Sequence, residues 1–61
     1  MIQKAYEELI RLIEDARDDV MKAEGGNKAA GTRVRKAMQD IKNQAQNVRK
    51  VVLDVRDQDD N

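Results

Sequence analysis

The chain has 61 residues, equal numbers of basic and acidic side chains, no cysteine, no histidine and one aromatic residue, Tyr6. This composition excludes disulfides, thiolate or imidazole metal sites and histidine-based catalysis, so we expect neither an enzyme nor a cofactor. A chain this short rarely builds a sufficient core without a disulfide, a metal or a partner chain. Self-association is therefore the stabilising device that remains.

Residues 2–23 are predicted to form the first helix. Its apolar side chains recur in alternating steps of four and three, which places them along one side of a helix. They are Ile2, Tyr6, Leu9, Ile13, Ala16, Val20 and Ala23. Ile10 and Leu12 widen this side into a broad apolar face. The first 24 residues carry four basic and seven acidic side chains, a net charge of −3.

A short turn at residues 24–27 should end the first helix. Gly25 and Gly26 can adopt the left-handed conformation that commonly follows a helix C-terminus. Asn27 then suits the N-cap of a second helix, because its side-chain oxygen can accept a hydrogen bond from a free backbone amide. Such a short connection predicts that the two helices lie antiparallel.

The second predicted helix covers residues 28–56. The same alternation of apolar positions continues along it, at Val34, Met38, Ile41, Ala45, Val48, Val52 and Val55. Gly31 weakens the start of this helix, so Thr32 is an alternative N-cap, with 27–31 as a longer loop. The acidic tail at 57–61 has no apolar side chain and is expected to fray.

A basic residue recurs every seven positions along the second helix. We call this set the basic stripe: Lys28, Arg35, Lys42, Arg49 and Arg56. If Val34 takes heptad position d, the basic stripe takes position e, at the edge of the apolar line. Residues 28–50 carry seven basic and one acidic side chain, a net charge of +6.

Two interpretations of the basic stripe stay open. Its members could form salt bridges between helices, as charged residues at position e often do. Alternatively, they could contact nucleic-acid phosphates, together with Arg33, Lys36 and Lys50 on the outer face. No aromatic side chain lies among them, so binding would use the duplex backbone rather than stacked bases.

These features predict an all-α fold, a single domain made of an antiparallel two-helix hairpin. Two helices cannot cover two broad apolar faces, so two hairpins should pair into a dimeric four-helix bundle, with a higher assembly as the alternative. The expected core and oligomer interface consists of Leu9, Ile13, Val20, Val34, Met38, Ile41, Val48 and Val52. No apolar run is long enough for a membrane span and no signal peptide is visible, so we expect a cytoplasmic protein.

One segment resembles a family signature: Gly26-Asn27-Lys28-Ala29-Ala30-Gly31-Thr32-Arg33-Val34-Arg35-Lys36. It is similar to the amino-terminal domain of the chlamydial linker-histone-like proteins and their short relatives in other bacteria. Their run reads Gly-Asn-Lys-Ala-Ala, two variable residues, then Arg-Val-Arg. An acidic amphipathic helix precedes it in both cases, and the likeness extends over about residues 5–55.

The resemblance implies a histone-like protein of the bacterial nucleoid that binds and compacts duplex DNA. The motif and the basic stripe together predict the DNA-binding residues Lys28, Arg33, Arg35, Lys36, Lys42, Arg49 and Lys50. The chlamydial proteins continue into a long tail rich in lysine, alanine and proline, whereas this sequence ends in an acidic segment, so we expect a short form. The alternative is a structural oligomerisation or adaptor coiled coil that binds no nucleic acid. Neither interpretation requires a membrane or a small-molecule substrate.

Overall fold

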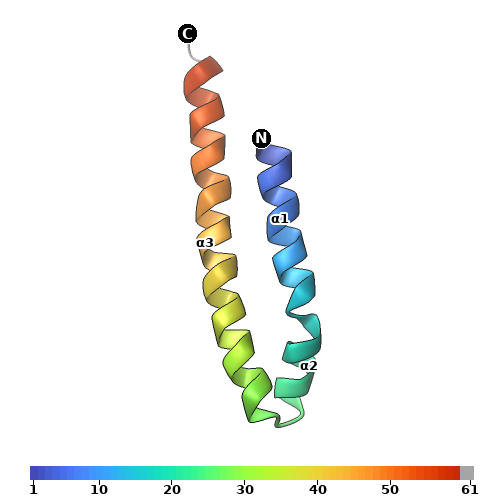
Figure 1. Ribbon diagram of the computed structural model, residues 1–61. Coiled ribbons are helices and arrows are strands. Elements are labelled where there is room, and N and C mark those ends of the chain that lie inside the picture. Colours follow the sequence, from blue (N-terminus) through green and yellow to red (C-terminus); the bar gives the residue numbers. More distant parts are fainter. Residues whose placement is uncertain (60–61) are drawn as a thin grey trace.

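The chain folds into a helical hairpin of two unequal arms. The computed structural model describes residues 1–59, and the side chains of residues 1–56. The first arm contains α1 (Ile2–Asp15) and α2 (Arg17–Glu24), and the second arm is α3 (Lys28–Asp59). The two arms lie side by side and antiparallel, and α3 extends well beyond the start of α1 (Figure 1). The predicted all-α hairpin is therefore confirmed.

The first arm differs from the continuous helix predicted over residues 2–23. α1 ends at Asp15 and α2 begins at Arg17, with Ala16 between them. The backbone amide of Ala16 donates to the carbonyl oxygen of Ile13 at 3.2 Å, a partner only three residues back. Such a bond tightens the chain locally, as in a 3₁₀ turn, and the arm bends there.

The turn between the arms has the hydrogen bonds of a Schellman motif. Gly26 has φ of 97°, in the left-handed region that glycine adopts without steric cost. Its amide donates to the carbonyl of Ala23, and the amide of Asn27 donates to the carbonyl of Lys22, both at 3.0 Å. These two bonds satisfy carbonyl groups that the end of α2 would otherwise leave without a partner.

Asn27 caps the N-terminus of α3. Its Oδ1 accepts a hydrogen bond from the amide of Ala30 at 2.9 Å. The predicted N-cap is therefore confirmed, and the later start after Thr32 is excluded. At its other end α3 continues to Asp59, three residues past the predicted end at Arg56. The last two residues of the predicted tail lie outside the described part of the chain.

Small side chains make the contact between the two arms. The three buried residues of the described chain are all alanines, Ala5, Ala16 and Ala30. Around them lie half-buried apolar residues of both arms: Leu9, Leu12, Ala23, Val34, Ala37, Ile41, Val48 and Val51. Small residues allow the two helix backbones to approach closely, which explains why Ala37 faces the first arm and its larger neighbour Met38 does not.

The contact side of α3 is therefore rotated from the predicted one. Leu9, Val34, Ile41 and Val48 lie half-buried between the arms. The other four residues of the expected core, Ile13, Val20, Met38 and Val52, are 40–48% exposed. Because Ala37 replaces Met38 on the contact side, Val34 takes heptad position a rather than d. The basic stripe then takes position b, on the outer side of α3, and the predicted position e was wrong.

The hairpin is too thin to bury a large core. Its Cα radius of gyration is 15.1 Å, whereas a compact chain of this length has about 10.5 Å. Within residues 1–56, no large side chain is fully buried. The accessible surface is 5108 Å², compared with about 4,000 Å² for a compact monomer of the same mass. None of the helices within residues 1–59 has the length and hydrophobicity needed to cross a bilayer.

Candidate nucleic-acid interface

The basic stripe follows the outer side of α3. Its members are seven residues apart, so they are spaced by about 10 Å and extend over about 42 Å along the helix. All five side chains are exposed. One turn of duplex DNA is about 34 Å long, so the basic stripe is long enough to lie beside phosphates over a full turn.

The hairpin supplies no anionic partner for most of these cations. Among the side chains of residues 1–56, all ion pairs involve Arg11, Arg17 or Arg33. Lys28, Arg35 and Lys42 take part in none of them, and Arg49 donates only to the neutral Oε1 of Gln46, at 3.4 Å. Salt bridges from these four residues to the first arm of the same chain are thus excluded.

Two further lysines extend the basic surface. Lys36 and Lys50 are exposed and each follows a member of the basic stripe, so both lie on the outer half of α3. The single acidic residue between 28 and 50, Asp40, follows Lys36 by four residues and so lies beside it, away from the line of Arg35, Lys42 and Arg49. The structure therefore brings together six of the seven predicted DNA-binding residues: Lys28, Arg35, Lys36, Lys42, Arg49 and Lys50.

Arg33 is separate from this group. Its Nε donates to Oδ1 of Asp19 at 3.0 Å, which links α3 to α2 near the turn. The carboxylate side chain is 26% exposed and the arginine side chain 52%. This contact joins residues 14 positions apart, so no helical spacing in the sequence could indicate it.

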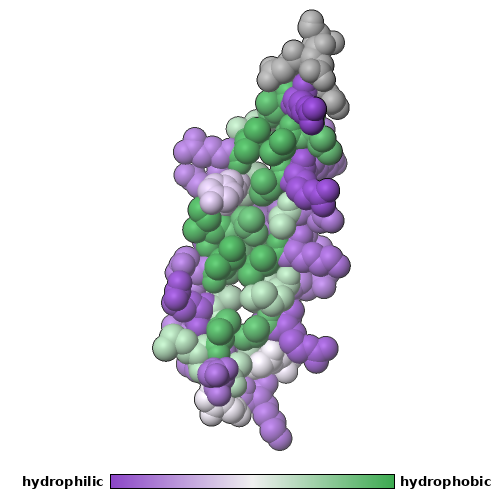
Figure 2. Space-filling model, turned by 180° about the vertical axis from the view of Figure 1, so that it is seen from behind, coloured by the Kyte–Doolittle hydropathy of each residue, from purple (hydrophilic) through white to green (hydrophobic). Residues whose placement is uncertain are grey.

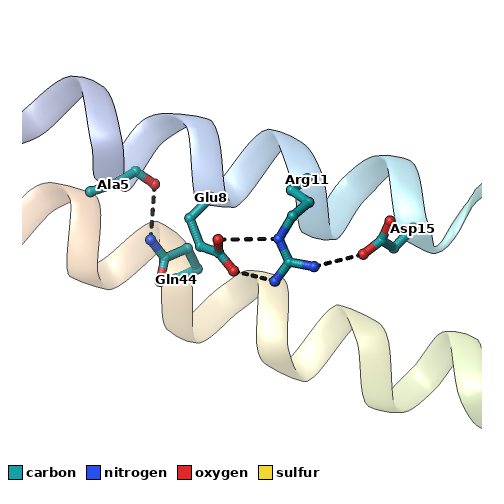
Figure 3. A network of polar contacts seen from close by, with 5 residues as sticks. All are labelled: Ala5, Glu8, Arg11, Asp15 and Gln44. Atoms are coloured by element: carbon teal, nitrogen blue, oxygen red, sulfur yellow. Dashed lines mark hydrogen bonds and ion pairs between the residues drawn. The ribbon is translucent and has the colours of Figure 1, made fainter.

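The arginines of the first arm are paired within their own arm. Arg11 donates to the carboxylates of Glu8 and Asp15, the latter at 2.9 Å (Figure 3). Arg17 donates to Glu14 at 3.0 Å. The hydrogen bonds from these arginines, and then their charge, hold the pKa of Glu8 and Glu14 below the ordinary value. The first arm thus neutralises its own arginines, and the arginines that form no ion pair with the side chains of residues 1–56 all lie on α3.

A polar contact fixes the arms near the open end of the hairpin. Gln44 lies on the contact side of α3 and is half-buried. Its Nε2 donates to the backbone oxygen of Ala5 at 2.9 Å (Figure 3). A directional bond inside an otherwise apolar contact favours one register of the two arms. The sequence gives no signal for this role, because Gln44 is a polar residue in an otherwise apolar alternation.

A second apolar surface remains uncovered. We call it the apolar face: Tyr6, Ile13, Val20, Met38, Ala45 and Val52. Except for the half-buried Ala45, these side chains are 40–54% exposed. Figure 2 shows the resulting hydrophobic band along both arms, bordered by hydrophilic edges. Between the arms it holds a shallow groove lined by Ile13, Val20 and Met38. The apolar face lies between the arm contact and the basic stripe.

Comparison with known proteins identifies a family. The family model described as histone H1-like protein Hc1 matches residues 3–58 of the chain. The family resemblance of residues 26–36 is therefore confirmed. This is a family of structural DNA-binding proteins and not of enzymes. No curated protein and no solved structure gives a significant match. Within the described residues, no cluster of three or more acidic side chains is arranged to hold a metal ion.

Proposed function

Because the chain belongs to the histone H1-like protein Hc1 family, we propose that it is a nucleoid-associated protein that binds duplex DNA through the basic stripe. The observation that carries this proposal is the charge pattern on the outer side of α3. Six exposed basic residues within 28–50 share this side, and none of them forms an ion pair with the side chains of residues 1–56. The bacterial cytoplasm, where the nucleoid lies, is the corresponding location.

The chemistry of such binding is electrostatic. Each lysine or arginine that approaches a phosphate releases a condensed counterion, and this release drives association with little regard to sequence. The long side chains of Arg35 and Arg49 can also present two parallel N–H donors to one phosphate. Without an aromatic side chain this surface cannot stack on unpaired bases. We therefore assign it to the duplex backbone, where contacts position the protein and do not select a site.

The proposal is tested by charge reversal on the outer side of α3. Arg35→Glu combined with Arg49→Glu should abolish duplex binding in fluorescence anisotropy at about 50 mM salt. Both side chains are exposed and neither forms an ion pair with the side chains of residues 1–56, so the helical circular dichroism spectrum should not change.

A matched control distinguishes an effect of the basic stripe from an effect of the net charge of the protein. Lys4→Glu combined with Lys22→Glu changes the total charge by the same amount, but both positions belong to the first arm. We expect this control to reduce DNA affinity far less than the α3 pair. Equal losses would show that net charge alone governs binding, and a loss of helicity in the α3 pair would place those arginines in protein contacts.

Self-association is the second part of the proposal. The hairpin exposes about 1,000 Å² more surface than a compact monomer of its mass, and a stable dimer buries about 800 Å² per partner. The apolar face offers contiguous hydrophobic surface for this purpose. Pairing of two hairpins over it would produce the four-helix bundle that the sequence predicts.

The apolar face also favours a second candidate function, an oligomerisation or adaptor module that binds no nucleic acid. In that case a partner protein, rather than phosphate, would neutralise the basic stripe. The two functions are distinguished by measuring duplex binding and mass in the same solution. An oligomer that ignores DNA even at about 50 mM salt supports the adaptor, since electrostatic binding is strongest there.

A further inference from the structure

Gly31 has no structural explanation within the hairpin. It lies inside α3, where glycine costs about 1 kcal/mol relative to alanine. A Cβ atom at this position would meet no atom within 4 Å, so the first arm does not require the missing side chain. Its backbone is not in the left-handed region either, where glycine would be needed. Close approach of a second molecule is the remaining physical reason for a glycine here.

Gly31 begins a line of residues that alternate in size. The line continues at Met38, Ala45 and Val52, each seven residues further, so all four lie on one side of α3. Met38, Ala45 and Val52 are the members of the apolar face that belong to α3, and Gly31 extends this line toward the turn. Small and large residues therefore alternate: glycine, methionine, alanine, valine. If two such lines run antiparallel about the midpoint of the line, Gly31 faces Val52 of the other copy, and Met38 faces Ala45.

We propose that two copies of the chain pair α3 against α3, antiparallel, with the twofold axis close to Ile41 and Lys42. Each large side chain of the line then meets a small one, which is how helices pack without voids. The alternative places α3 against the first arm of the other copy, with both turns at the same end. In that arrangement Gly31 lies level with Val20 of the facing helix, but the two large side chains Met38 and Ile13 face each other.

The overhang of α3 supports the same arrangement. α3 extends beyond the first arm (Figure 1). Its side chains Val52 and Leu53 are 40% and 55% exposed. Antiparallel pairing of the full length of α3 brings the start of the other α3 to this overhang and covers Val52. If both turns lay at the same end, α3 would face the first arm of the other copy. That arm is too short to reach Val52, so Val52 would stay exposed. The excess surface of about 1,000 Å² per hairpin is sufficient for such an interface.

In the paired state, two chains together form the candidate DNA-binding surface. The basic stripe borders the paired line, and it is symmetric about Lys42. Two basic stripes therefore lie beside each other on one face of the dimer, so that half of the cations come from each copy. This consequence rests on the proposed DNA-binding function. Like charges oppose each other across the axis, so the dimer should become tighter when salt screens them or when a duplex binds them.

Engineered cysteines test the pairing, because the natural chain has none. In Met38→Cys combined with Ala45→Cys, the two thiols of one chain are about 10 Å apart along the helix and cannot bridge each other. In the proposed dimer each faces the other position of the second copy. We expect oxidation to convert most of the protein into a covalent dimer closed by two disulfides, with Met38→Cys alone as the control.

The outcome is read by non-reducing electrophoresis and mass spectrometry. A closed dimer in the double variant, and little in the single one, supports the pairing. A mixture of higher species, or equal dimer in both variants, would overturn it. Gly31→Leu, which introduces a side chain where Val52 of the other copy must lie, should weaken association at least tenfold in sedimentation equilibrium. Unchanged association of this variant would likewise overturn the pairing.

The shared DNA surface is tested with the same double variant. Its oxidised form should bind duplex with a steeper salt dependence than its reduced form, when both are measured at a concentration where the reduced form is monomeric. The slope reports the number of phosphate contacts, so it should approximately double. A closed dimer that binds no duplex would refute the DNA function and the shared surface, but not the pairing. Duplex binding without a closed dimer would refute the pairing and leave the DNA function intact.

Discussion

The two arms of the hairpin have similar apolar patterns but opposite electrostatic designs. In the first arm Arg11 and Arg17 are held by carboxylates three or four residues away, and the arm is acidic overall. In α3 the members of the basic stripe are seven residues apart, and residues 28–50 contain a single acidic side chain. A carboxylate three or four residues away permits pairing within a helix, and Arg35, Lys42 and Arg49 have none at that spacing. Charge pattern therefore decides which arm can attract an external anion.

The arms use their apolar residues in the same way. The first arm packs Ala5, Leu9 and Ala16 toward α3 and leaves Tyr6 and Ile13 exposed. The second arm likewise divides its apolar residues between the arm contact and the apolar face. One side of α3 faces the first arm, and the neighbouring side belongs to the uncovered apolar face. A substitution should therefore have different effects on the two sides, and this difference can be measured.

The largest effect is expected at Ile41, which lies half-buried between the arms. Ile41→Asp places a charge in this contact and should cost about 3 kcal/mol or more, enough to remove most of the helical circular dichroism signal. Met38→Asp, three residues earlier on the apolar face, should instead lower the mass in sedimentation and keep the helical spectrum. If Ile41→Asp lowered only the mass and Met38→Asp removed the helical signal, the assignments of the arm contact and the apolar face would be wrong.

The next effect concerns the junction between the arms. Asn27→Ala removes the side-chain acceptor for the amide of Ala30 and should lower the free energy of unfolding by about 1 kcal/mol. Thermal unfolding at fixed protein concentration measures the change. Asn43→Ala, an exposed asparagine within α3, is the matched control and should be neutral or slightly stabilising. Equal destabilisation of both variants would contradict the capping role.

A smaller effect is expected where the first arm meets the middle of α3. Gln44→Ala removes the hydrogen bond to Ala5 and should cost up to about 1 kcal/mol, because a neutral hydrogen bond contributes little net stability. Faster amide hydrogen exchange at the start of α1 should accompany the loss. The exposed Gln39→Ala variant should leave that exchange unchanged, and an equal increase there would exclude a specific role for Gln44.

The smallest effect is a dependence on pH in the first arm. Arg11 keeps the pKa of Glu8 below its ordinary value in the folded chain, so folding favours the ionised carboxylate. The resulting stabilisation is complete above the ordinary glutamate pKa of about 4.3 and is lost as pH falls through the lower folded value. The melting temperature should therefore fall on acidification, and less so in Glu8→Gln. Glu7→Gln, at an exposed position outside these ion pairs, should leave the fall unchanged.

The hairpin was predictable because its signals are local. Gly26 and Asn27 mark the turn, and each helix repeats its apolar residues every seven positions. The side of α3 that faces the first arm was not predictable from that repeat. Two overlapping apolar lines run along the helix, and only the fit of small residues, such as Ala37, against the opposite backbone selects between them.

The candidate site was predictable to a similar extent. The basic stripe is a periodic feature of a single helix, so its members could be named from spacing alone. Its place on the outer side depended on the side chosen for the arm contact. The pairing of Arg33 with Asp19 joins two elements, and the bend at Ala16 occurs without a glycine or proline nearby. Neither feature leaves a local signal in the sequence.

The most direct test of the central claim is a salt titration of duplex binding by the unaltered protein. Six phosphate contacts, one for each basic residue on the outer side of α3 within 28–50, predict a loss of about a thousandfold in affinity between about 50 and 200 mM salt. The dissociation constant should follow that steep line for duplexes of unrelated sequence. Absence of binding at 50 mM salt, or an affinity that does not depend on salt, would contradict the assignment of α3 as a phosphate-binding helix.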